Sequence, residues 1–254
     1  MTQTGPSADS KEINLLFEKL KCFYPKQIID VDCEGRIQDL DDVFSQFEVG
    51  RNSFFQFISG LINCSIWQSW DYDKNPLRDL CLNLSNEVDR LNDKMTTEPA
   101  YHSRAHFQDV CLSLTILLMQ DDARLPSNNL RRSWHMDLEN RWILLFCAIG
   151  HDFGHDGSIN QSPFELEKAS LQKIDKFLGE QNCLPEYIQE LMSKVEPIIL
   201  STDPSYYSTL CDQLRIIDTN YNPIMAMSGL MVESDLLASV LPKTGMQLSL
   251  RLGE

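Results

Sequence analysis

Helical spacing of apolar residues is the feature that most limits how this 254-residue chain can fold. In the segment 84–95, for instance, apolar residues fall three or four positions apart, at Leu84, Val88, Leu91 and Met95. That spacing places one face of a helix against a core. The best strand candidate, residues 27–32, has no clear pairing partner nearby. The pattern therefore predicts an all-α fold.

The same pattern, combined with capping and breaking residues, places the other helices. They are expected at residues 54–70 (a helix and a turn), 106–120, 137–149, 163–178 and 185–200, and in segments that start at 209 and 223. Ser162, Pro163 and Glu165 match a cap, a first helical position and a capping-box carboxylate. Pro197 is expected to kink the 185–200 helix or to end it early.

The chain has no internal repeat, low-complexity tract or clear domain linker. We expect a flexible tail at residues 1–10, a helical N-terminal subdomain at residues 11–86 and a core domain at residues 87–254. Three roles stay open for the segment before residue 87: packing against the core, regulating it, or forming a homodimer.

Charge and composition exclude several classes of protein. A net charge of −15 argues against a bulk nucleic-acid binder, whose affinity depends on Lys and Arg. There is no run of about 18 apolar residues, so no membrane span is expected, and the polar start lacks a signal-peptide pattern. The eight cysteines form no C-x-x-C pair, which predicts free thiols in the reducing cytoplasm.

Four of the five histidines form two compact groups, His102 with His106 and His151 with His155. Within each group the two histidines are four residues apart, a spacing that places both rings on one face of a helix. Asp152 directly follows His151. Imidazole and carboxylate are ligands of Zn²⁺, Mn²⁺ and Fe, and a carboxylate can also reach a harder ion such as Mg²⁺. The two groups therefore predict a metal site.

The two groups stand in segments that resemble a known signature. Tyr101, His102, His106, Asp109 and Val110 fit Y-H-N-x-x-H-x-x-D-V with Ser103 in place of Asn, and His151, Asp152, His155, Gly157 and Asn160 fit H-D-x-x-H-x-G-x-x-N in full. This signature is that of the catalytic domain of class I 3′,5′-cyclic nucleotide phosphodiesterases, in the superfamily of HD-domain metal-dependent phosphohydrolases. The resemblance covers about residues 87–241 and implies a compact multi-helix HD-domain fold, with residues 87–254 as the catalytic core.

The resemblance implies a centre of two divalent metals. Its ligands for the first, Zn²⁺, would be His106, His151, Asp152 and Asp235, the last from a segment that matches the family's final metal Asp only in part. Asp152 would also face a second ion, Mg²⁺ or Mn²⁺, held mainly by water. Water activated at the metals would attack the phosphorus of a small phosphoester, and a cyclic nucleotide (cAMP or cGMP) would give the 5′-nucleotide.

The resemblance also implies roles for other residues. His102 would give a proton to the leaving oxygen, and His155 would orient waters of the second metal. The remaining residues expected to bind substrate or to support the ligands are Tyr101, Asn160, Thr202 and Asp203. A Glu that supports the proton-donating His is expected in the family, and Glu165, Glu167 and Glu180 remain open for this role.

Two points of the resemblance leave alternatives. The family's purine-recognising Gln lies far downstream of the last metal Asp, and Gln247 is too close to Asp235 to match it. Either the chain is a fragment or its base pocket is built differently. The rival functions are another HD-type phosphohydrolase (a nucleotidase, a dNTP hydrolase or a (p)ppGpp hydrolase) and a non-catalytic sensory module that keeps its metal.

Overall fold

The computed structural model describes residues 40–42, 44, 53–97, 99, 101–123, 136–216 and 222–252. Within these ranges the chain forms helices and turns and no strand, which confirms the all-α prediction. The expected tail at residues 1–10, the strand candidate at 27–32 and the fifth histidine, His135, lie outside the described residues.

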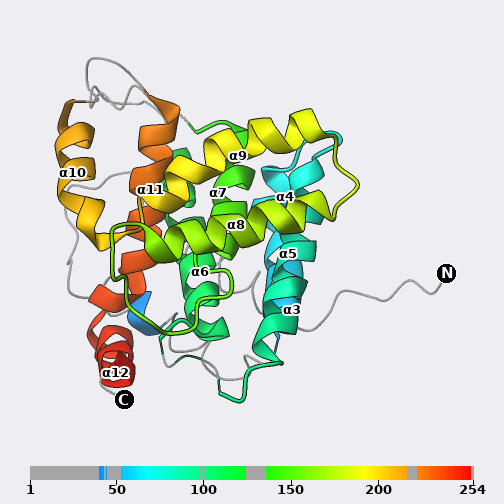
Figure 1. Ribbon diagram of the computed structural model, residues 1–254. Coiled ribbons are helices and arrows are strands. Elements are labelled where there is room, and N and C mark those ends of the chain that lie inside the picture. Colours follow the sequence, from blue (N-terminus) through cyan, green and yellow to red (C-terminus); the bar gives the residue numbers. More distant parts are fainter. Residues whose placement is uncertain are drawn as a thin grey trace.

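The described helices follow one another in a simple order. They are α3 (Phe54–Ile62), α4 (Ser65–Ser69), α5 (Pro76–Asn92), α6 (Arg104–Ala123), α7 (Leu138–Gly150), α8 (Glu165–Gly179), α9 (Pro185–Leu200), η1 (Pro204–Tyr206), α10 (Tyr207–Ile216), α11 (Pro223–Leu237), η3 (Ala238–Val240) and α12 (Pro242–Leu252). In Figure 1, α8 and α9 lie side by side over α6 and α7, with α3, α4 and α5 on one flank and α10 and α11 on the other.

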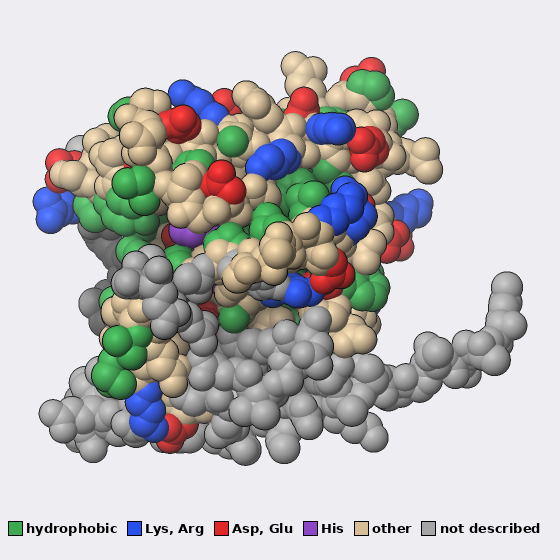
Figure 2. Space-filling model, turned by 60° about the horizontal axis from the view of Figure 1, so that its bottom comes forward, with side chains coloured by type: hydrophobic (Ala, Val, Ile, Leu, Met, Phe, Trp, Pro, Cys, Tyr) green, Lys and Arg blue, Asp and Glu red, His purple; other side chains and the backbone are tan. Residues whose placement is uncertain are grey.

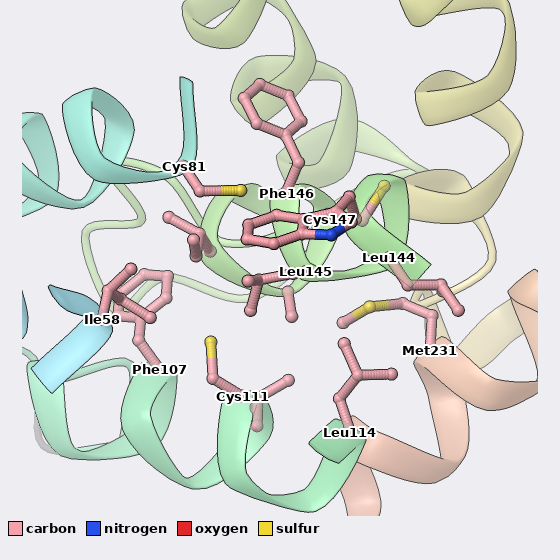
Figure 3. Close-up of a cluster of buried hydrophobic side chains, with 14 of the residues drawn as sticks. Ile58, Cys81, Phe107, Cys111, Leu114, Leu144, Leu145, Phe146, Cys147 and Met231 are labelled. Atoms are coloured by element: carbon pink, nitrogen blue, oxygen red, sulfur yellow. The ribbon is translucent and has the colours of Figure 1, made fainter. Parts of the chain in front are cut away.

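The centre of the molecule is the packing of α6, α7 and α11. From Arg141 to Gly150 every residue of α7 is buried, as the apolar sequence of this segment predicts. Three cysteines, Cys81, Cys111 and Cys147, lie in this core (Figure 3) and are free thiols. Burial raises the pKa of each of them, so these thiols are protonated and poorly reactive.

The first turn of α7 is fixed by local and distant contacts. The carboxylate of Asp137 accepts a hydrogen bond of 2.7 Å from the backbone N–H of Asn140, the capping contact expected where the helix begins. The indole N–H of Trp142 donates to the carbonyl of Trp70 at 2.9 Å, and its ring meets Trp67 edge-on at 5.1 Å. These contacts set the position of α7, whose C-terminal cap is His151, the first histidine of the second motif.

The predicted start of the 163–178 helix was wrong by two residues, because α8 begins at Glu165. Glu165 does accept a hydrogen bond from the N–H of Ser162, as a capping box requires. Phe164, however, donates its N–H to the carboxylate of Asp203 and adopts a left-handed conformation (φ 64°). This contact across 39 residues decides where the helix starts.

The sequence also predicted that Pro197 would kink the 185–200 helix or end it early. Pro197 lies in the last turn of α9, and the helix continues past it to Leu200 rather than ending early.

The expected boundary at 86/87 falls inside α5, which packs against both α3 and α7. On α5 the buried carboxylate of Asp89 accepts hydrogen bonds of 2.9 Å from the N–H groups of Phe54 and Phe55, and thereby caps α3.

Helix α11 with η3, Pro223–Val240, has the length and mean hydropathy of a membrane-crossing helix, the one such stretch among the described residues. The helix packs against α6, α7, α9 and α10. Its apolar composition is that of a core helix, which agrees with the expectation of no membrane span.

Candidate metal centre

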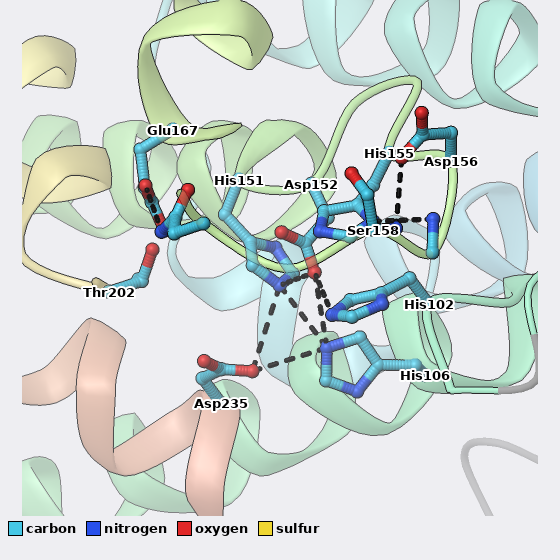
Figure 4. Close-up of polar contacts among 12 residues, drawn as sticks. His102, His106, His151, Asp152, His155, Asp156, Ser158, Glu167, Thr202 and Asp235 are labelled. Carbon is cyan, nitrogen blue, oxygen red and sulfur yellow. Dashed lines mark hydrogen bonds and ion pairs between the residues drawn. The ribbon is translucent and has the colours of Figure 1, made fainter. Parts of the chain in front are cut away.

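Four of the side chains that the sequence predicts as ligands converge where α6, α7 and α11 meet (Figure 4). His106 comes from the first turn of α6, and Asp235 from the last turn of α11. His151 is the C-terminal cap of α7, its N–H bonded to the carbonyl of Cys147, and Asp152 follows it. Both histidine side chains are 1–2% exposed and both aspartates 15–16% exposed.

Five distances among these four side chains are close to the separation of two ligands on one tetrahedral metal ion. His106 Nε2 lies 3.3 Å from His151 Nε2, 3.2 Å from Asp235 Oδ1 and 3.6 Å from Asp152 Oδ2. His151 Nε2 lies 3.2 Å from Asp152 Oδ2 and 3.7 Å from Asp235 Oδ1. Ligands at about 2.0–2.2 Å from a tetrahedral Zn²⁺ are about 3.3–3.6 Å apart. His106, His151 and Asp235 therefore form one compact group of possible ligands, and Asp152, which lies close to both histidines, belongs to a second group with His102 and His155.

The tautomer of His151 also suits a metal ligand. Its Nδ1 lies 3.0 Å from the carbonyl oxygen of Ala148, which can only accept a hydrogen bond, so Nδ1 carries the proton. When the ring is neutral, the lone pair is on Nε2, the atom that faces His106 and the two aspartates. A backbone carbonyl commonly orients a metal-binding histidine in this way.

The charges in the site favour a cation. Burial would lower the pKa of His106, but hydrogen bonds to Asp152 and Asp235 outweigh it and raise the pKa to about 10. Burial would raise the pKa of Asp152, yet the charge of His151 and contacts with His106 hold it well below its usual value. In the metal-free protein, protons on imidazole therefore balance the two carboxylates, and a divalent cation can replace them.

Zn²⁺ binding is expected to release protons at pH 7, and the apparent affinity is expected to rise between about pH 6 and pH 8. The reason is that His106 must lose a proton held with a pKa of about 10 before it can bind a metal. Isothermal titration calorimetry in two buffers of different ionisation enthalpy counts these protons. A titration heat that is identical in both buffers would contradict the expectation.

A second group consists of His102, Asp152 and His155, whose potential ligand atoms lie within 4.8 Å of one another. The rings of His102 and His155 are stacked, with centroids 3.7 Å apart, and His102 Nε2 lies 3.7 Å from Asp152 Oδ2. Burial lowers the pKa of His102 to about 4, although the charge of Asp152 opposes this. The structure thus brings together two His/Asp groups that could hold metal ions.

The sequence predicted that the two histidines of each pair share one face of a helix. That prediction was wrong, although the four histidines do converge. His102 precedes α6 and His155 follows α7, so neither pair shares one helix. Each group instead takes one histidine from each motif. The close approach of α6 and α7, rather than the spacing of four, brings the rings together.

Tyr101 packs against the first group. Its ring is tilted over that of His106, with centroids 4.6 Å apart. Burial, with the negative charges of Asp235 and Asp152, raises the pKa of its hydroxyl, which is therefore protonated. In Figure 2 histidine atoms are visible in a recess of the surface, so the site can be reached from solvent.

Asn160 holds the loop after α7 in place by hydrogen bonds. Its side-chain amide donates to both oxygens of Glu167, at 3.3 and 3.1 Å, and to Asp203 at 3.3 Å, while its oxygen accepts from the N–H of Leu166. Asp203 also accepts from the N–H of Ser205. The hydroxyl of Thr202 donates to the carbonyl of Ile199 at the end of α9.

Among the three glutamates left open by the sequence, only Glu167 is buried. Burial raises its pKa, and the charges of Asp203 and Asp152 add to this effect. Glu165 and Glu180 are exposed. The sequence carried a signal for this burial, because Glu167 shares the helical phase of the buried residues Ser170, Leu171, Ile174, Phe177 and Leu178.

Tyr207 lies near the two His/Asp groups, and sequence reasoning missed it. It begins α10 and donates its hydroxyl to the carbonyl of Thr202 at 3.0 Å. Burial and the charge of Asp235 raise the pKa of that hydroxyl. No motif pointed to it, because its place depends on how α10 follows η1 and packs on α11.

No family model matches the chain, and no curated protein matches it. The fold and the site define an all-helical protein in which His and Asp side chains form two groups that could hold metal ions.

Proposed function

We propose that this protein is a metal-dependent phosphohydrolase whose substrate is a 3′,5′-cyclic nucleotide. The observation that carries the proposal is the set of five distances of 3.2–3.7 Å among His106, His151, Asp152 and Asp235. The choice of a cyclic nucleotide rests on the resemblance of the two histidine motifs to those of class I phosphodiesterases.

The proposed first metal is Zn²⁺, because two imidazoles and two carboxylates are ligands that Zn²⁺ accepts. Asp152 also belongs to the second group, and we propose that it faces a Mg²⁺ or Mn²⁺ ion whose other ligands are mostly water. Divalent ions at such a centre lower the pKa of water and polarise phosphoryl oxygens.

His102 is the proposed proton donor to the leaving oxygen. It lies beside Asp152 and is not one of the four proposed Zn²⁺ ligands. Its pKa of about 4 in the substrate-free protein means that it is neutral at pH 7. A bound phosphoester anion would raise that pKa, because a nearby negative charge stabilises imidazolium. The buried Glu167, through Asn160, holds the loop that carries the second motif.

The proposal is tested by incubating the purified protein with cAMP or cGMP in the presence of Zn²⁺ and Mg²⁺, or of Mn²⁺. We expect 5′-AMP or 5′-GMP, resolved by chromatography, and loss of the product when a chelator removes the metals. The same protein is offered nucleoside monophosphates, dNTPs and (p)ppGpp. Hydrolysis of these and not of cyclic nucleotides would assign the other HD-type activities, while bound metal without any hydrolysis would support a non-catalytic module.

A further inference from the structure

His155 makes a hydrogen bond that fixes where its proton lies. Its Nδ1 is 2.9 Å from the backbone nitrogen of Gly157, whose N–H points at the ring. An N–H can only donate, so Nδ1 must hold a lone pair. A neutral imidazole carries one proton, and that proton is therefore on Nε2. An imidazolium is incompatible with this contact, because both of its nitrogens are donors.

The backbone turn around His155 is what presents the N–H of Gly157 to the ring. Gly157 has φ of +86°, a conformation that favours glycine, and a side chain there would approach Pro99. The N–H of His155 donates to the carbonyl of Asp152 at 2.9 Å, which closes the turn after α7. The ring itself is stacked on that of His102 and is nearly buried.

The tautomer restricts what His155 can do at the centre. In this form Nε2 has no lone pair for a cation, and the lone pair of Nδ1 is occupied by Gly157. A water that binds a cation through its oxygen directs its hydrogens outward and needs an acceptor, which an N–H cannot provide. The ring can therefore act at the centre only as a donor through its Nε2–H, and it has no free acceptor for the hydrogens of a metal-bound water.

We infer that His155 is held by Gly157 as the Nε2–H tautomer and acts as a hydrogen-bond donor to an anionic oxygen of the substrate. It lies in the group with His102 and Asp152, next to the proposed proton donor (Figure 4). The identity of the anion as a phosphoester rests on the proposed function. An N–H donor beside the proposed metal centre would stabilise negative charge that develops on phosphoryl oxygens.

The tautomer is tested directly by ¹⁵N NMR of the histidine ring nitrogens, before and after addition of Zn²⁺ and Mg²⁺. We expect Nε2 of His155 to be protonated in both states. A proton on Nδ1, or loss of the Nε2 proton when metal is added, would overturn the inference. This readout needs no activity, so its outcome is separate from that of the proposed function.

Two glycines of the same loop give a matched pair of variants. Gly157→Ala is expected to disturb the single tautomer, because the turn that presents its N–H is strained by a side chain. Gly154 also has a positive φ (+73°), but the N–H that bonds the His155 ring belongs to Gly157. Gly154→Ala should therefore keep the tautomer. Equal ring-nitrogen spectra in the two variants would count against the role of Gly157.

Substitution of His155 itself tests the donor with inorganic phosphate as the probe. The amide of Gln can place an N–H near the position of Nε2 and cannot bind a metal as imidazole does. We expect His155→Ala to weaken phosphate binding by about 10-fold or more, and His155→Gln to stay within about threefold of the parent. Metal content should be unchanged in both, and loss of metal from either would identify His155 as a ligand instead.

Discussion

Replacing Asp152 by alanine is expected to lower the affinity for Zn²⁺ by more than about 100-fold and to abolish phosphoester hydrolysis. Its Oδ2 lies within 3.2–3.7 Å of ring nitrogens of His151, His106 and His102, so it contacts both groups. Loss of a residue that only supports a metal ligand costs about 10–100-fold, and loss of a ligand itself should cost more. Metal content by mass spectrometry of the native protein and turnover of the cyclic nucleotide measure the two effects.

Asp156 provides the control for that variant. It lies in the same loop, is exposed, and accepts a hydrogen bond from the N–H of Ser158 rather than facing the first group. Asp156→Ala should keep metal content and should change the rate by no more than about twofold, as is usual for surface positions. If Asp152→Ala retained as much metal as Asp156→Ala, the proposed ligand set would be wrong.

The second large effect is on stability, where Trp142→Ala is expected to lower the free energy of unfolding by about 3–5 kcal/mol. Trp142 is fully buried, packs on Trp67 and donates its indole N–H to the carbonyl of Trp70. Alanine would leave a cavity and a buried carbonyl without its donor. Urea denaturation followed by circular dichroism gives the change.

Leu138 on the same helix is the matched control, because 39% of this residue is exposed. Leu138→Ala should change the free energy of unfolding by no more than about 0.5 kcal/mol. Similar losses in the two variants would mean that the Trp142 contacts with Trp67 and Trp70 contribute little.

The sequence by itself determined the helices and the chemistry available to them. Apolar spacing placed α6, α7, α9 and α11 closely, because a helix that packs on a core must repeat its apolar face every three or four residues. The helix predicted at residues 84–95 was wrong at its start, because α5 begins at Pro76 and ends at Asn92. The motifs supplied the residue types of a metal site at His106, His151 and Asp152 without any knowledge of their neighbours.

Only the tertiary structure decided how those residues combine. Asp235 reaches the centre because α11 packs on α6, and the short segment around it gave only a partial signal. Phe164 leaves the helical conformation because Asp203, far along the chain, accepts its N–H. The proton of His155 is placed by the N–H of Gly157 through the turn of the loop. Sequence spacing fixes which face of a helix a residue occupies, whereas a ligand set, a helix start and a tautomer depend on atoms that folding brings within hydrogen-bond distance.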